Sequence, residues 1–112
     1  MHGDDRIRLR HMLDACDQIA AFVEGRTRLH LDHDRMLLFA LIRAIEVLGE
    51  AAARISDPTQ AAHPEIPWKA IIGMRNRLIH AYFDVDPNLV WIAASQEVPT
   101  LRVRVQAVLD RG

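Results

Sequence analysis

The residues best suited to chemistry lie in one short stretch, RNRLIHAYFD, at positions 75–84. It contains Arg75, Asn76, His80 and Tyr82. In a helix, Asn76 and His80 share a face because they are four residues apart, whereas Arg75 and His80 lie about 140° apart around the axis. One helix therefore does not present Arg75 and His80 side by side, and we expect a twofold dimer to bring two such sets into one cleft.

These residue types suit cleavage of RNA by its own 2′-hydroxyl group, without a metal. A histidine serves as base or acid near neutral pH, and an arginine binds phosphate and stabilises its developing charge. An asparagine can hold the imidazole or bind the phosphate. By spacing alone, however, an arginine and a histidine on one helix are more often structural. By spacing alone, too, Tyr82 is more often a half-buried ring whose hydroxyl meets solvent.

Four segments with helical periodicity must position this stretch. They run from about 4 to 24, from Asp32 or Asp34 to about 55, from Pro67 to near 80, and from Pro87 to about 109. Asp86 is the expected cap of the last segment, and Pro99 predicts a kink or break inside it. Asp57 and Pro58 predict a short capped turn before the third. Together they predict one all-α domain, an antiparallel bundle of four to five helices.

The periodicity also predicts which residues face the core. In the first segment the apolar residues at helical spacing are Ile7, Met12, Cys16, Ile19 and Val23. In the second segment the core-facing residues are Leu37, Leu41, Ile45, Leu48, Ala52 and Ile55. Its opposite, polar side carries Arg43, Glu46, Glu50 and Arg54, and Glu50 and Arg54 have the spacing of an ion pair.

Three large apolar residues, Met36, Phe39 and Val47, share the polar side of the second segment. They indicate either a contact with another chain or a solvated face with a few stray apolar residues.

Composition limits the classes of function. The net charge is −1, whereas proteins that bind nucleic acid through bulk charge are far more basic, so any such contact must be local. Cys16 is the single cysteine, which excludes an internal disulfide and favours a cytoplasmic setting. The start, MHGDDRIRLR, lacks the apolar run of a secretory signal. No stretch approaches the roughly 20 apolar residues of a membrane span, so we expect no membrane association.

One group of residues raises the question of a metal site. His30, Asp32, His33 and Asp34 could form a metal cluster, but these types at the start of a helix are more often caps and surface charge. There is no glycine-rich phosphate loop, so use of ATP by this chain itself is not expected. We therefore expect no metal and no cofactor.

The stretch RNRLIHAY fits the Arg-x4-His-x-Tyr pattern of HEPN-domain proteins. It resembles specifically the HepT-like toxins that are paired with minimal nucleotidyltransferase antitoxins. Other segments resemble the same family: GEAA at 49–52, HPEIPW at 63–68, GMRN at 73–76 and FDVDPNLVW at 83–91. The resemblance covers nearly the whole chain. It implies a single HEPN domain over residues 1–112, a homodimer and a metal-independent endoribonuclease.

By this resemblance, Arg75 and His80 are the catalytic pair, and Asn76 supports them. The partner nucleotidyltransferase would attach AMP to Tyr82 and so silence the toxin. The alternative is a non-catalytic HEPN module that docks a nucleotidyltransferase or binds a nucleotide without cutting RNA. The complete set of Arg75, Asn76 and His80 favours the enzyme, because a docking module has no need of it.

Overall fold

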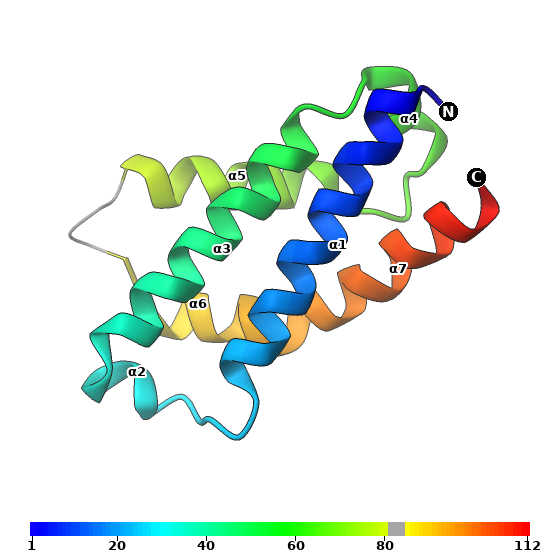
Figure 1. Cartoon of the computed structure of the whole chain (residues 1–112). Helices are drawn as coiled ribbons and strands as arrows, with labels where there is room; N and C mark the ends of the chain where they lie inside the picture. Colours follow the sequence, from blue (N-terminus) through cyan, green and yellow to red (C-terminus); the bar gives the residue numbers. More distant parts are fainter. Residues whose placement is uncertain (81–84) are drawn as a thin grey trace.

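The computed structural model describes residues 1–80 and 85–112, with side chains for 1–78 and 85–112. Its long elements are α1 (Gly3–Val23), α3 (Arg35–Ala53), α5 (Trp68–His80) and a composite of α6 (Pro87–Ile92), η1 (Ala93–Glu97) and α7 (Val98–Arg111) (Figure 1). Two short helices, α2 (His30–His33) and α4 (Asp57–Ala62), lie in the connections. The predicted all-α architecture with four major helices is confirmed. Among the described residues, no helix is long and apolar enough to cross a bilayer.

Helix α3 occupies the centre of this arrangement. It packs along α1 on one side and along α5 on another, while α1 also packs against α7 (Figure 1). Different faces of α3 therefore contact different helices, one face packing on α1 and another on α5. The face toward α5 is the most relevant to function, because α5 carries Arg75, Asn76 and His80.

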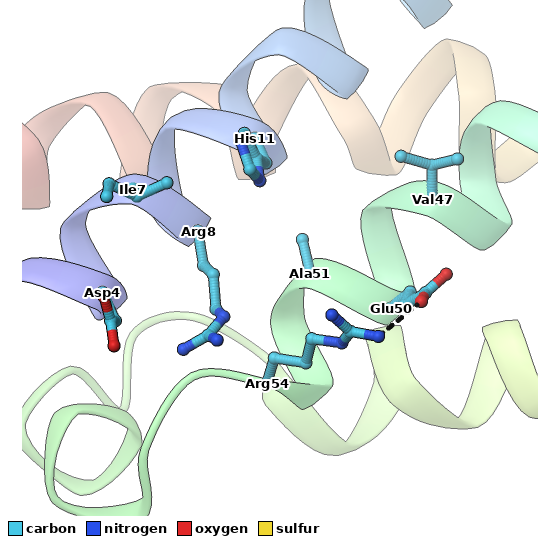
Figure 2. A pocket seen from close by; sticks show the side chains of 8 residues that line it. All are labelled: Asp4, Ile7, Arg8, His11, Val47, Glu50, Ala51 and Arg54. Carbon is cyan, nitrogen blue, oxygen red and sulfur yellow. Dashed lines mark hydrogen bonds and ion pairs between the residues drawn. The ribbon is translucent and has the colours of Figure 1, made fainter.

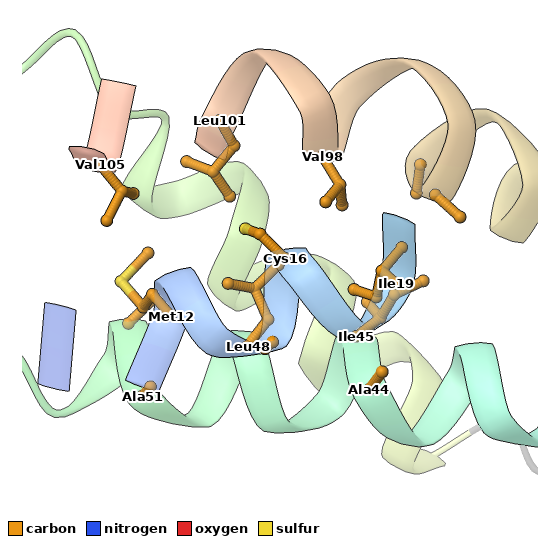
Figure 3. Packing of buried hydrophobic residues seen from close by; sticks show 14 of the residues in the cluster. Met12, Cys16, Ile19, Ala44, Ile45, Leu48, Ala51, Val98, Leu101 and Val105 are labelled. Carbon is orange, nitrogen blue, oxygen red and sulfur yellow. The ribbon is translucent and has the colours of Figure 1, made fainter. Parts of the chain in front are cut away.

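The core lies between α1, α3 and α7. Figure 3 shows Met12, Cys16 and Ile19 of α1 gathered with residues of α3 and α7. All six predicted core positions of the second segment are buried: Leu37, Leu41, Ile45, Leu48, Ala52 and Ile55. Burying one large aliphatic side chain contributes about 1.5–3 kcal/mol, so this stripe holds α3 in its central place.

The prediction for the start of α1 was wrong at Ile7, which is 53% exposed, whereas Asp5 is only 2% exposed. Asp5 lies one turn before Leu9 and takes the inward position, and Ile7, two residues later, points to the opposite side. The Asp5 carboxylate accepts hydrogen bonds from the backbone N–H of Ser56 (3.0 Å), from its hydroxyl (2.5 Å) and from the hydroxyl of Thr59 (2.7 Å). These bonds connect the start of α1 to the first turn of α4.

Burial by itself raises the pKa of the Asp5 carboxyl. The hydrogen bonds from the side chains of Ser56 and Thr59 and from the backbone of Ser56 outweigh this effect and lower the pKa to about 2. Asp5 is therefore ionised at neutral pH although it is buried. Periodicity alone gave no sign of this polar cluster, because its partners lie more than fifty residues away.

The helix caps decide between Asp32 and Asp34, the two candidates that the sequence left open. Asp34, and not Asp32, caps α3, since its carboxylate accepts the backbone N–H of Leu37 at 3.0 Å. Asp86 caps α6 by accepting the backbone N–H of Asn88 at 2.8 Å, as predicted. Carboxylates at these positions satisfy N–H groups that have no partner within the helix.

Two prolines mark the remaining boundaries. At α4 the predicted cap was wrong, because Ser56 occupies the capping position and Asp57 is the first helical residue. The predicted interruption at Pro99 is present: the π-helical turn η1 comes directly before α7, which begins at Val98. Proline has no N–H to donate to the carbonyl four residues earlier, and its ring clashes with that carbonyl in an α-helix. The wider π turn accommodates both effects.

Candidate active site

Helix α5 carries three of the four residues that the sequence singles out. Arg75 and Asn76 lie in its second half, and His80 is its last residue. Tyr82 lies outside the described residues, as does the side chain of His80. The geometry of the site therefore rests on Arg75, on Asn76 and on the face of α3 that meets them.

Gly49 of α3 sets how closely α5 approaches. A Cβ atom at Gly49 would lie 2.2 Å from Cβ and 2.9 Å from Cγ of Arg75, and 3.2 Å from the carbonyl oxygen of Ile71. Only glycine leaves room for this contact, although glycine inside a helix costs about 1 kcal/mol relative to alanine. The stem of Arg75 is thus held directly against the backbone of α3.

The guanidinium of Arg75 has one partner among the described residues. Its Nη1 donates a hydrogen bond to Oδ1 of Asn76 at 3.0 Å, which leaves the Asn76 amide nitrogen available as a donor. Its Nε is buried and meets no acceptor within the described part of the chain. Leaving a buried donor unpaired costs about 1–3 kcal/mol, so this arrangement is not explained by stability of the single chain.

None of the ion pairs formed by the described residues includes Arg75. Its positive charge is therefore not neutralised by any carboxylate of the described residues. An arginine in this state is suited to bind an anionic group, and a phosphate matches the fork of its donors.

The outer side of α3 combines apolar and charged side chains, as the sequence indicates. Met36 is 83% exposed, Phe39 52% and Val47 36%. The predicted ion pair is present, with Arg54 Nη2 3.1 Å from Glu50 Oε1. This side of α3 presents an apolar surface that the described part of the chain does not cover.

Sequence reasoning missed a hollow of about 320 Å³ between α1 and α3. Its lining residues come from successive turns of the two helices, as Figure 2 shows. They are Asp4, Ile7, Arg8, His11, Val47, Glu50, Ala51 and Arg54. Asp4, Arg8 and His11 are spaced to share one face of α1, and this spacing was the available signal. Charges of both signs line the hollow, so it has no preference for an anion.

The suspected metal cluster serves other purposes. His30 accepts a backbone N–H at 2.9 Å, Asp32 pairs with Arg28 at 2.9 Å, and Asp34 caps α3. Among the side chains of residues 1–78 and 85–112, no group of three or more His, Cys, Asp or Glu is placed to hold a metal ion. Cys16 is buried as predicted, and burial raises the pKa of its thiol to about 12. It is therefore not a nucleophile at neutral pH.

Comparison with known proteins agrees with the resemblance in the motif. The family model described as “Ribonuclease HepT-like” matches residues 12–108, which is most of the chain. The match includes α3, α5 and the segment between α5 and α6. No solved structure shows significant similarity to the chain.

Three curated relatives carry related names. A “Putative RNase” of Caldanaerobacter subterraneus subsp. tengcongensis is 33% identical over 103 residues, which cover 92% of each chain. A “Putative RNase” of Methanocaldococcus jannaschii is 31% identical over 105 residues, covering 94% of this chain and 96% of the relative. A “Probable ribonuclease HepT” of Thermococcus cleftensis is 44% identical over 69 residues, covering 62% of this chain and 63% of the relative.

Proposed function

Since the chain belongs to the HepT-like ribonuclease family, we propose that it is a metal-independent endoribonuclease whose reaction depends on Arg75 and His80, with Asn76 in support. The observation that carries this proposal is the state of Arg75. Its stem is held against Gly49, its Nη1 bonds to Asn76, and no described carboxylate neutralises it. A fixed, uncompensated guanidinium is what binding of a phosphodiester requires.

The reaction assigned to this site is transesterification. The 2′-oxygen of the RNA forms a bond to phosphorus after a base removes its proton, and the bond from phosphorus to the 5′-oxygen breaks. An acid returns a proton to the leaving 5′-oxygen. The products are a 2′,3′-cyclic phosphate and a 5′-hydroxyl. His80 serves as base or acid, Arg75 steadies the charged phosphorus centre, and the Asn76 amide donates to a phosphate oxygen.

The proposal includes a twofold homodimer whose interface lies near α5 and the outer side of α3. Arg75 and His80 lie about 140° apart around one helix axis, so a second copy is the simplest way to complete the site. The exposed Met36, Phe39 and Val47 supply apolar area for such a contact.

The proposed biological role is that of a toxin in a toxin–antitoxin pair. Its antitoxin would be a nucleotidyltransferase, and the hydroxyl of Tyr82 would attack the α-phosphate of ATP, releasing pyrophosphate and leaving AMP on the ring. Support for Tyr82 comes from its place in the Arg-x4-His-x-Tyr pattern. The added phosphodiester is negatively charged, so it could pair with Arg75 in place of the substrate phosphate.

Expression of the chain alone in cells tests the enzyme against the docking module. We expect growth to stop, and we expect His80→Ala to remove this arrest because the acid–base group is lost. His33→Ala is the matched control, since His33 is an exposed histidine on another helix. Both variants must show the same helical circular dichroism as the parent. Equal growth of cells expressing the parent and His80→Ala would favour the non-catalytic module.

A further inference from the structure

The outer side of α5 carries a row of residues that joins the candidate catalytic residues to Lys69 and Arg77, two cations that the proposed reaction does not use. At 100° per residue, Lys69, Gly73 and Asn76 lie within about 60° of one another around the helix axis. Arg77 borders this row, and the backbone position of His80 falls on the same side. Lys69, Asn76 and Arg77 are all exposed. The row therefore begins at the start of α5 and ends at the candidate catalytic residues.

The positive charge of this row is not compensated by any described residue. Neither Lys69 nor Arg77 forms an ion pair or a side-chain hydrogen bond with any other described residue. Helix α5 itself contains no Asp or Glu. In contrast, six arginines elsewhere pair with carboxylates: Arg26, Arg28, Arg43, Arg54, Arg102 and Arg111. In a chain of net charge −1, the outer side of α5 is a locally basic surface.

Gly73 adds an independent observation in the middle of the row. A Cβ atom at Gly73 would meet nothing within 4 Å, so close packing does not explain a glycine there. Glycine in a helix interior costs about 0.5–1 kcal/mol relative to alanine. A bare stretch of helix backbone lets an extended ligand approach closely between Lys69 and Asn76.

There is also space beyond Lys69. A hollow of about 630 Å³ lies between α4 and the start of α5, with Gln60, Pro64 and Lys69 in its lining. Asp57 is the one acidic residue that lines it. The hollow leaves room for a further nucleotide whose phosphate contacts the lysine.

We propose that Lys69 and Arg77 bind backbone phosphates of a single-stranded RNA on one side of the cleaved bond, so that the strand runs along α5 from His80 toward α4. This inference rests on the proposed ribonuclease function. Lys69 lies about 10 Å along the helix axis from Asn76, so it contacts a phosphate beyond the one at the reaction centre. Contacts of this kind neutralise charge and position the strand without reading base sequence.

The test compares Lys69→Ala and Arg77→Ala with Arg10→Ala. Arg10 is the matched control because it is an exposed arginine on α1 with no ion pair among the described residues. Each protein is assayed on a single-stranded oligonucleotide and on a dinucleotide with one phosphodiester, which is too short to reach Lys69. We expect the preference for the oligonucleotide, measured as a ratio of kcat/KM, to fall several-fold in Lys69→Ala through a higher KM. Arg10→Ala should keep the ratio of the parent.

Salt dependence gives a second readout that a merely structural role would not move. Each lost phosphate contact should reduce the slope of log kcat/KM against log salt by about 0.7 for a single strand. If the parent cleaves RNA and both variants keep its ratio and its slope, the inference is wrong while the ribonuclease proposal stands.

If the parent cleaves no RNA, the proposed function is wrong, and the inference about Lys69 is then tested by RNA binding alone. Fluorescence anisotropy of a labelled oligonucleotide with the His80→Ala chain measures it directly. Weaker binding and a smaller salt slope when Lys69→Glu is added, and not when Arg10→Glu is added, would support the RNA contact. Unchanged binding would overturn it and leave a solvated basic face.

Discussion

Gly49 of α3 lies directly beneath the side-chain stem of Arg75 of α5, at a distance that leaves no room for even one methyl group. The two residues are 26 positions apart in the chain, and they lie in two different segments that resemble the family. The contact fixes both the depth at which α5 packs on α3 and the starting point of the Arg75 side chain. A residue outside the proposed catalytic set thus determines where the guanidinium of Arg75 can lie.

Gly49→Ala should lower activity by moving Arg75. The new methyl group forces α5 outward, and a displacement of about 1 Å at a reacting group can cost on the order of 10²-fold in rate. We expect the loss in kcat more than in KM, measured by steady-state cleavage of RNA. Gly3→Ala is the control, because a Cβ atom there meets nothing within 4 Å.

A double-mutant cycle shows whether Gly49 acts through Arg75. If it does, Gly49→Ala should cost little further activity in a chain that already carries Arg75→Lys. A Gly49→Ala protein that folds and retains full activity would contradict the positioning role. Equal losses in both backgrounds would indicate general destabilisation, which thermal unfolding would reveal.

Phe39→Asp should break the proposed dimer and with it the cleavage of RNA. The change places a charge in the centre of the exposed apolar surface of α3, where it would have to be desolvated in the contact. Molecular mass in solution, measured by light scattering, should fall from two chains to one. Val103→Asp is the control, since Val103 is also an exposed apolar residue but lies on α7. An active parent that is monomeric at micromolar concentration would rule the dimer out.

Cleavage should continue in EDTA and should yield ends with a 2′,3′-cyclic phosphate. The reason is the type of residue in the site, which supplies its own acid–base group and its own cation. His80→Ala should reduce the rate by about 10²–10⁴-fold. Arg75→Lys should also be damaging because an ammonium does not reproduce the guanidinium fork. Mass spectrometry of the RNA ends checks the product. Activity that disappears in EDTA and returns with magnesium would overturn this mechanism.

Tyr82→Phe should keep ribonuclease activity and should escape silencing by the cognate nucleotidyltransferase and ATP. Phenylalanine preserves the ring and removes the hydroxyl that would accept AMP. Mass spectrometry of the co-expressed pair measures the adduct on Tyr82. A chain that is inactivated without such an adduct would instead indicate blocking by the bound partner.

Asp5→Ala should destabilise the fold without touching the site. It removes three hydrogen bonds to a buried carboxylate, and bonds to charged groups contribute about 1.5–3 kcal/mol each. Asp14→Ala is the control on the same helix, since Asp14 is exposed. Thermal unfolding at neutral pH should show a clear loss of Tm for Asp5→Ala only.

At acidic pH the parent chain should lose its stability advantage over Asp5→Ala. The pKa of Asp5 is lowered from 3.8 to about 2 in the folded state, so its ionised form contributes stability above pH 3.8. That contribution is lost as the pH falls from about 4 through 2. The difference in Tm between the parent and Asp5→Ala should therefore shrink over this range. A constant difference would mean that the carboxylate charge is not what holds Ser56 and Thr59.

The sequence by itself determined the helices and the family. The apolar spacing of the second segment predicts its six core positions, Asp86 is a recognisable cap, and Pro99 predicts the interruption before α7. These features depend on neighbours within one or two helical turns, so a linear reading contains them. The Arg-x4-His-x-Tyr pattern is local for the same reason, and it led to the family that the comparisons support.

Only the tertiary structure decided how distant segments meet. At the start of α1, Asp5 is buried and Ile7 is exposed, because Ser56 and Thr59 supply hydrogen-bond partners that make a buried carboxylate favourable. It also placed Gly49 under Arg75. Periodicity states which side of a helix faces inward, but the depth and crossing of two helices depend on the volumes of all side chains between them. These volumes come from several segments at once, so no single stretch of sequence determines the depth or the crossing of the helices.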